Sequence, residues 1–162
     1  GALARPGVKR AALVMRGGRA HGLPATADTP DEPVRELGAF LHEPDGAIIR
    51  ARLIGEVARA LDAGMTATGI AYLTGDTPKT TPFTSTFRIL EQLPSDVKAL
   101  ARALRERAIG TIEIKKRGVD IDPAALRTKL KLKGSASGTL FVTRINGKRA
   151  TLLAERIPNP AN

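Results

Sequence analysis

The chain has 162 residues, 42% of them hydrophobic, and a formal net charge of +10. Cysteine and tryptophan are absent, which excludes disulfides, thiolate catalysis and thiolate metal sites. One Tyr and four Phe are too few for a surface that stacks several unpaired bases. No apolar stretch approaches the roughly 18 residues of a membrane helix, so we expect a cytoplasmic protein without a membrane partner.

The first expected element is a β-hairpin within residues 8–23. Its two runs flank Gly17-Gly18, and glycine supplies the positive φ angles that a two-residue turn requires. Residues 24–33 carry three prolines and three acids without periodicity. We therefore expect an irregular linker over residues 24–39 and a domain boundary there.

An amphipathic helix of about four turns is expected after Asp45-Gly46. Its apolar residues recur every four positions, and Gly64 suits its end; they are Ile49, Leu53, Val57 and Leu61. Residues 69–73 form a short strand candidate before a turn-rich loop. Residues 83–93 predict the next strand.

Helices and strands alternate in the C-terminal half. Ser95 suits the N-cap of a helix that reaches about Arg107, residues 111–115 alternate as a strand, and Asp122-Pro123 begins a helix to about Leu130. After that residue the pattern fits either more helix or an extended segment. Two further strands around Asn146-Gly147 complete a β-α-β-α-β-β order from 83 to 156, so the predicted fold class is α+β.

The excess charge is confined to one segment. Residues 98–150 hold 14 Lys or Arg and 4 acids, whereas the rest of the chain holds 12 of each sign. Such a local field attracts polyanions, of which nucleic acid is the usual one. Solvated lysines are the ordinary alternative.

Twelve of these cations are candidate phosphate ligands. They form four groups. A stripe on one expected helix consists of Lys98, Arg102 and Arg105, and the end of the next strand carries Lys115, Lys116 and Arg117. The next helix and the residues after it hold four cations that do not share one face, and the last two strands are expected to place two arginines directly opposite each other; these are Arg127, Lys129, Lys131 and Lys133, and Arg144 and Arg149. An opposed like-charge pair is unfavourable unless an anion or acid lies nearby, or the two side chains splay into water.

We expect no metal, no catalytic residue and no bound cofactor in this chain. His21 and His42 lack ligand spacing, and the Asp120 and Asp122 carboxylates suit a turn and a helix cap. His42-Glu43 reads as a strand end before a helix, without a nucleophile nearby.

Three segments resemble a known family: LHEPDGAIIRA at 41–51, GIAYLTGD at 69–76 and EIKKRGVDIDP at 113–123. They are similar to the THUMP-like domain that follows the catalytic domain in a family of class I S-adenosylmethionine-dependent methyltransferases, common in actinobacteria. The resemblance covers residues 40–157. Residues 1–23, with ARPGVKR at 4–10, resemble the terminal hairpin of the preceding methyltransferase domain, and residues 158–162 read as a tail.

The resemblance implies a C-terminal, non-catalytic accessory fragment of a methyltransferase. The glycine-rich loop and the Asn/Asp-Pro-Pro-aromatic sequence of a complete enzyme are missing, so S-adenosylmethionine is expected for the parent protein and not for this fragment. By analogy with THUMP domains of tRNA-modifying enzymes, the expected partners are RNA, such as tRNA or rRNA, and the protein's own methyltransferase domain. The alternative is a docking domain whose basic face packs on acidic protein; an independent enzyme is disfavoured.

Overall fold

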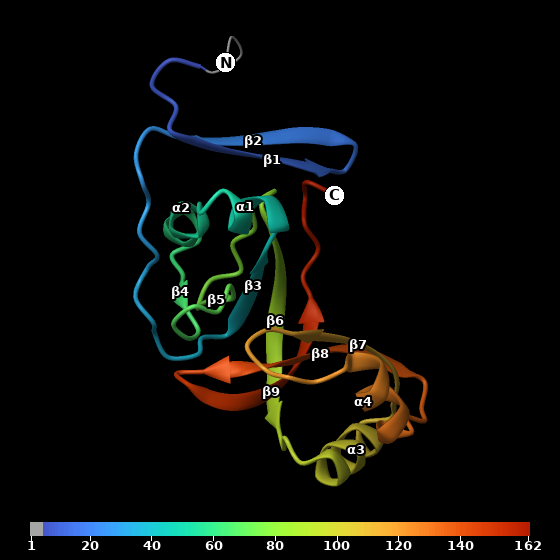
Figure 1. Cartoon of the computed structure of the whole chain (residues 1–162). Helices are drawn as coiled ribbons and strands as arrows, with labels where there is room; N and C mark the ends of the chain where they lie inside the picture. Colours follow the sequence, from blue (N-terminus) through green and yellow to red (C-terminus); the bar gives the residue numbers. More distant parts are fainter. Residues whose placement is uncertain (1–4) are drawn as a thin grey trace.

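The computed structural model describes residues 5–162 (Figure 1). Its N-terminal hairpin pairs β1 (Arg10–Arg16) with β2 (Arg19–Ala25) as a separate two-stranded sheet. Gly17 and Gly18 form the turn with φ angles of +59° and +72°. The predicted hairpin and its glycine turn are therefore confirmed.

A second sheet has seven strands in the order β4-β5-β3-β6-β9-β8-β7. The strands are β3 (Phe40–Pro44), β4 (Gly64–Met65), β5 (Leu73–Gly75), β6 (Thr84–Leu93), β7 (Ile109–Lys116), β8 (Ala136–Ile145) and β9 (Lys148–Arg156). Neighbours are antiparallel except β7 and β8, which are parallel because a helix connects them. The predicted α+β class and the β-α-β-α-β-β order are confirmed.

Two helices cover one face of the sheet at β7, β8 and β9. They are α3 (Val97–Glu106) and α4 (Pro123–Leu130). Figure 1 shows them next to each other at one end of the molecule. Their buried Leu104 and Leu130 join Ile112, Leu140 and Leu153 of the strands in one core cluster, so apolar burial fixes which sides of the helices face water.

The other face of the sheet holds a cluster of aromatic rings. Tyr72 and Phe87 each meet Phe141 edge to face, with ring centroids 5.3 and 4.8 Å apart. Strand β7 lies four places from β3, a span of about 19 Å in a flat sheet at ~4.8 Å per strand. Lys115 Nζ on β7 is nevertheless 2.9 Å from Glu43 Oε1 on β3. The sheet therefore curls so that this face is concave.

The predicted four-turn helix is wrong, because the segment forms two short helices. These are α1 (Gly46–Arg50), which is capped by Asp45, and α2 (Ile54–Ala60). The chain breaks between them at Arg52, whose φ is +57°. Ile48 and Leu53 are both fully buried, so the bend lets each helix turn its apolar side to the same core.

Three local predictions also need correction. Gly64 lies in β4 rather than ending a helix, and the expected strand at 69–73 is displaced to Leu73–Gly75 after Gly69, whose φ is +73°.

The cap of α3 is Asp96, whose Oδ2 accepts from Ala99 N at 2.9 Å. Ser95 Oγ instead lies 3.0 Å from Thr151 Oγ1. After α4, Lys131 adopts a φ of +48° and ends the helix without starting a strand.

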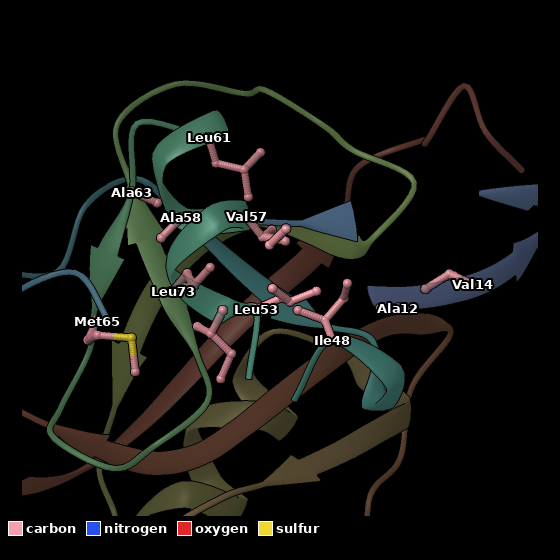
Figure 2. Packing of buried hydrophobic residues seen from close by; sticks show 12 residues of the cluster. Ala12, Val14, Ile48, Leu53, Val57, Ala58, Leu61, Ala63, Met65 and Leu73 are labelled. Atoms are coloured by element: carbon pink, nitrogen blue, oxygen red, sulfur yellow. The ribbon is translucent and has the colours of Figure 1, made fainter. Parts of the chain in front are cut away.

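The N-terminal hairpin packs against the α1–α2 layer. Ala12 and Val14 of β1 share a core cluster with Ile48 and Val57 (Figure 2). Arg16 donates to Ser85 Oγ at 3.1 Å and also to the Thr84 carbonyl. Placing the hairpin in a preceding domain, with residues 24–39 as a linker, remains a prediction. Within residues 5–162, no helix is long and apolar enough to cross a membrane.

Candidate nucleic-acid interface

Helix α3 separates an apolar side from a cationic side. Leu100, Ala101 and Leu104 are buried against the sheet. The predicted stripe of Lys98, Arg102 and Arg105 is exposed, because residues spaced i, i+4 and i+7 share one side of a helix. The sequence pattern therefore gives the correct exposure for all three side chains.

Helix α4 adds a second set of cations beside α3. Leu126 and Leu130 are buried, whereas Arg127 and Lys129 are exposed, as are Lys131 and Lys133 after the helix. Arg105 Nη1 donates to the Leu130 carbonyl at 3.1 Å and so satisfies an acceptor at the end of α4. Arg127 turns toward β7, with Nη2 3.4 Å from the Ile112 carbonyl.

We call the cations on or directly after these two helices the basic face: Lys98, Arg102, Arg105, Arg127, Lys129, Lys131 and Lys133. None of them has a carboxylate within 4.0 Å in residues 5–162. The neighbouring Arg107, by contrast, bonds Glu91 at 2.8 Å and lowers the pKa of that carboxyl. The charge of the basic face is thus not neutralised by acids of the described chain.

The structure divides the Lys115, Lys116 and Arg117 group between the two faces of the sheet. Lys116 is exposed. It lies two and four residues after Ile114 and Ile112 on β7, so it points to the same side of the sheet as they do, which is the side that the helices cover. Lys115 lies on the concave face between Glu43 Oε1 at 2.9 Å and Glu113 Oε1 at 3.2 Å.

Arg117 also lies away from the basic face. Its guanidinium carbon is 5.2 Å from the centre of the Tyr72 ring, and its buried Nε has no hydrogen-bond acceptor among the described residues. Lys115 and Arg117 therefore do not converge with the stripe on α3.

Arg144 lies directly opposite Arg149, as the two-residue turn predicted. Arg144 Nε donates to the Gly118 carbonyl at 3.0 Å, and its Nη1 donates to the Gly147 carbonyl at 3.1 Å. Backbone carbonyls thus supply the negative partial charge that offsets the like-charge pair. Each arginine lies an even number of residues along its strand from a residue of the helix-covered core, and such residues point to the same face of a sheet. Both arginines therefore lie on the same side of the sheet as α3 and α4.

The remaining titratable candidates are buried or belong to helix caps. His42 is fully buried, its Nδ1 lies 2.8 Å from Thr86 Oγ1, and burial lowers its pKa to about 4. Asp122 Oδ1 accepts from Ala124 N at 3.0 Å, which confirms its capping role. Across residues 5–162 no group of three or more His, Asp or Glu side chains could hold a metal ion.

Sequence reasoning missed the cluster that Glu43, Tyr72 and Lys115 form on the concave face. Burial raises the pKa of Tyr72, and the nearby Glu43 carboxylate raises it further. Each residue comes from a different one of the three segments at 41–51, 69–76 and 113–123. Their joint resemblance to one family was the available signal, because segments that are far apart in sequence carry no other mark of contact.

The domain thus combines an α+β order with two cationic helices on one face of a curled sheet. Residues 84–156 match the model of the THUMP domain-like family. The predicted family resemblance is confirmed.

Two relatives carry uncharacterised S-adenosylmethionine-dependent methyltransferase names, from Mycobacterium tuberculosis strains CDC 1551 / Oshkosh and ATCC 25618 / H37Rv. Each is 38% identical over 144 residues, which is 88% of this chain and 38% of the relative. The chain therefore spans about two fifths of these relatives. A crystal structure described as a candidate methyltransferase from Porphyromonas gingivalis W83 shares the fold, with a TM-score of 0.65 and 19% identity over 87% of this chain and 35% of that one.

Proposed function

We propose that this chain is a non-catalytic accessory region of an S-adenosylmethionine-dependent methyltransferase, and that it holds RNA through the basic face. The names of the two mycobacterial relatives support the parent activity. The exposed cations of α3 and α4, which have no carboxylate partner within residues 5–162, carry the proposal of RNA binding. In this scheme residues 1–23 end the methyltransferase domain, 24–39 link it to a THUMP-like domain over 40–157, and 158–162 form a tail.

The burial of the aromatic rings supports contacts to phosphates rather than to unpaired bases. Phe40, Tyr72, Phe87 and Phe141 are each at most 5% exposed, and Phe83 is half-buried. Proteins that bind single strands stack bases on exposed rings. A surface that presents Lys and Arg instead suits the backbone of structured RNA, such as tRNA or rRNA. S-adenosylmethionine would belong to the rest of the parent protein.

Charge reversal on the basic face tests RNA binding. We expect the triple variant K98E/R102E/K129E to bind structured RNA at least about tenfold more weakly at moderate salt, with a log-log salt slope reduced by about three. Electrophoretic or fluorescence titration at several salt concentrations measures both quantities. We omit Arg105 because its bond to Leu130 would confound folding with binding.

The matched control is R19E/R50E/R52E, which makes the same change in net charge. These three arginines are exposed and unpaired in the described chain, and they lie on the hairpin and around α1. We expect their reversal to leave the salt slope nearly unchanged. Equal losses in both variants would indicate attraction by net charge alone. Unchanged RNA binding in the first variant, with weaker binding to an acidic protein, would favour the docking function instead.

A further inference from the structure

Strand β1 has the composition of a strand that is covered on both faces. Residues 11–15 read Ala-Ala-Leu-Val-Met, a continuous apolar run rather than the alternation of a strand with one face in water. The described residues cover one of these faces: Val14 is 2% exposed, whereas Leu13 and Met15 are 64% and 66% exposed. The second face therefore lacks the cover that its sequence suits.

The pairing of β1 with β2 extends this uncovered surface. Ala11 lies opposite Pro24, Leu13 opposite Gly22 and Met15 opposite Ala20, and directly opposed residues point to the same side of a sheet. All six are apolar and exposed. We call them the hairpin outer face. Figure 1 shows the hairpin as an outer layer, with α1 and α2 beneath it and no helix or strand above it, where the chain segment before β1 rises from one end of the hairpin.

The hairpin outer face itself carries no charged side chain. Residues 10–25 contain no Asp or Glu. Their arginines lie on the opposite side, because Arg10 and Arg16 share the strand side of the buried Ala12 and Val14, and Arg19 lies opposite Arg16. A hollow of about 520 Å³ runs along the face between Arg5, Val8, Leu13 and Pro24. The complementary surface would therefore be an apolar patch.

We propose that the hairpin outer face packs against the S-adenosylmethionine-dependent methyltransferase domain of the longer protein. This inference rests on the proposed parent function. The match with each mycobacterial relative covers 88% of this chain and 38% of the relative. The larger part of each relative therefore lies outside the match and could supply the surface that covers the hairpin outer face. The hairpin thus joins two cores: its inner face packs on α1, and its outer face packs on the methyltransferase domain.

Hydrogen exchange on the longer protein and on this chain alone tests the contact. We expect the amides of residues 11–24 to exchange at least about tenfold more slowly in the longer protein. Leu13→Asp should abolish that difference while it shifts the melting temperature of the isolated chain by less than about 2 °C, because Leu13 is exposed there. Leu90→Asp is the control, since Leu90 is also exposed, at 50%, but lies on β6. It should retain the slow exchange.

Equal exchange of the hairpin amides in the two proteins would overturn the inference. It would also be overturned if the isolated chain dimerised in sedimentation experiments and Leu13→Asp abolished the dimer, because the face would then belong to a second copy. Failure of RNA binding is a separate outcome. The K98E/R102E/K129E variant changes RNA affinity without touching the hairpin, and Leu13→Asp should leave RNA affinity unchanged.

Discussion

At the residue scale, Lys115 shows how the structure changes the meaning of a cation. Its position in a basic run suggested a side chain free to contact phosphate. The curl of the sheet instead places its ammonium between two carboxylates, with its side chain 21% exposed and that of Glu43 20% exposed. The pair connects β7 to β3, so its contribution is to stability.

We predict a coupling of about 1 kcal/mol between Lys115 and Glu43, because a half-buried ion pair is worth more than an exposed one. Unfolding in denaturant of both single variants to Ala and of the double variant measures it. Lys116→Glu is the control, and it should change stability by less than about 0.5 kcal/mol since that side chain is exposed and unpaired among the described residues. Additive effects at positions 43 and 115 would contradict the role of the pair.

His42 predicts a pH dependence of stability. Burial lowers its pKa from 6.5 to about 4, so the folded state prefers the neutral ring and the unfolded state takes up a proton first. This contribution is complete above pH 6.5 and is lost as the pH falls from 6.5 toward 4, by at most about 3 kcal/mol.

Denaturant unfolding at several pH values between 4 and 7 checks this dependence, and His42→Gln should flatten it. Carboxylates titrate in both proteins, so the difference between them isolates the histidine. An unchanged pH profile in the variant would show that His42 takes up its proton over the same pH range in the folded and unfolded states.

At the element scale, side-chain caps decide where the cationic helices begin. Asp96 caps α3 and Asp122 caps α4, each by accepting a backbone N–H of the first turn. The buried leucines then set the rotation of each helix. Together these contacts determine which cations of the basic face point into water.

Asp122→Ala should destabilise the protein by about 1 kcal/mol because the first turn of α4 loses its acceptor. Thermal or denaturant unfolding measures the change. Asp120→Ala is the neighbouring control, since Asp120 is exposed, and we expect an effect below about 0.5 kcal/mol. Comparable losses in the two variants would show that the carboxylates act together rather than as one cap and one turn residue.

At the scale of the whole molecule, two surfaces of different chemistry lie on different elements. The basic face lies on α3 and α4, and the hairpin outer face lies on β1 and β2 (Figure 1). Asn159 Nδ2 also donates to the carbonyls of Thr81 and Thr84, near the bonds of Arg16. The C-terminal segment and the hairpin thus both donate hydrogen bonds to the turn before β6.

The sequence alone determined the elements that depend on residues close together in the chain. These are the glycine hairpin, the helix start at Asp122-Pro123, the Asn146-Gly147 turn and the stripe of cations on α3. Tertiary structure decided the rest. The break at Arg52 arises because two helices pack on one core, and the division of Lys115 and Arg117 from Lys116 follows from strand alternation on a sheet with two packed faces. Charge counts along a chain cannot distinguish these sides, since the curl that brings Glu43 to Lys115 depends on strands paired far apart in sequence.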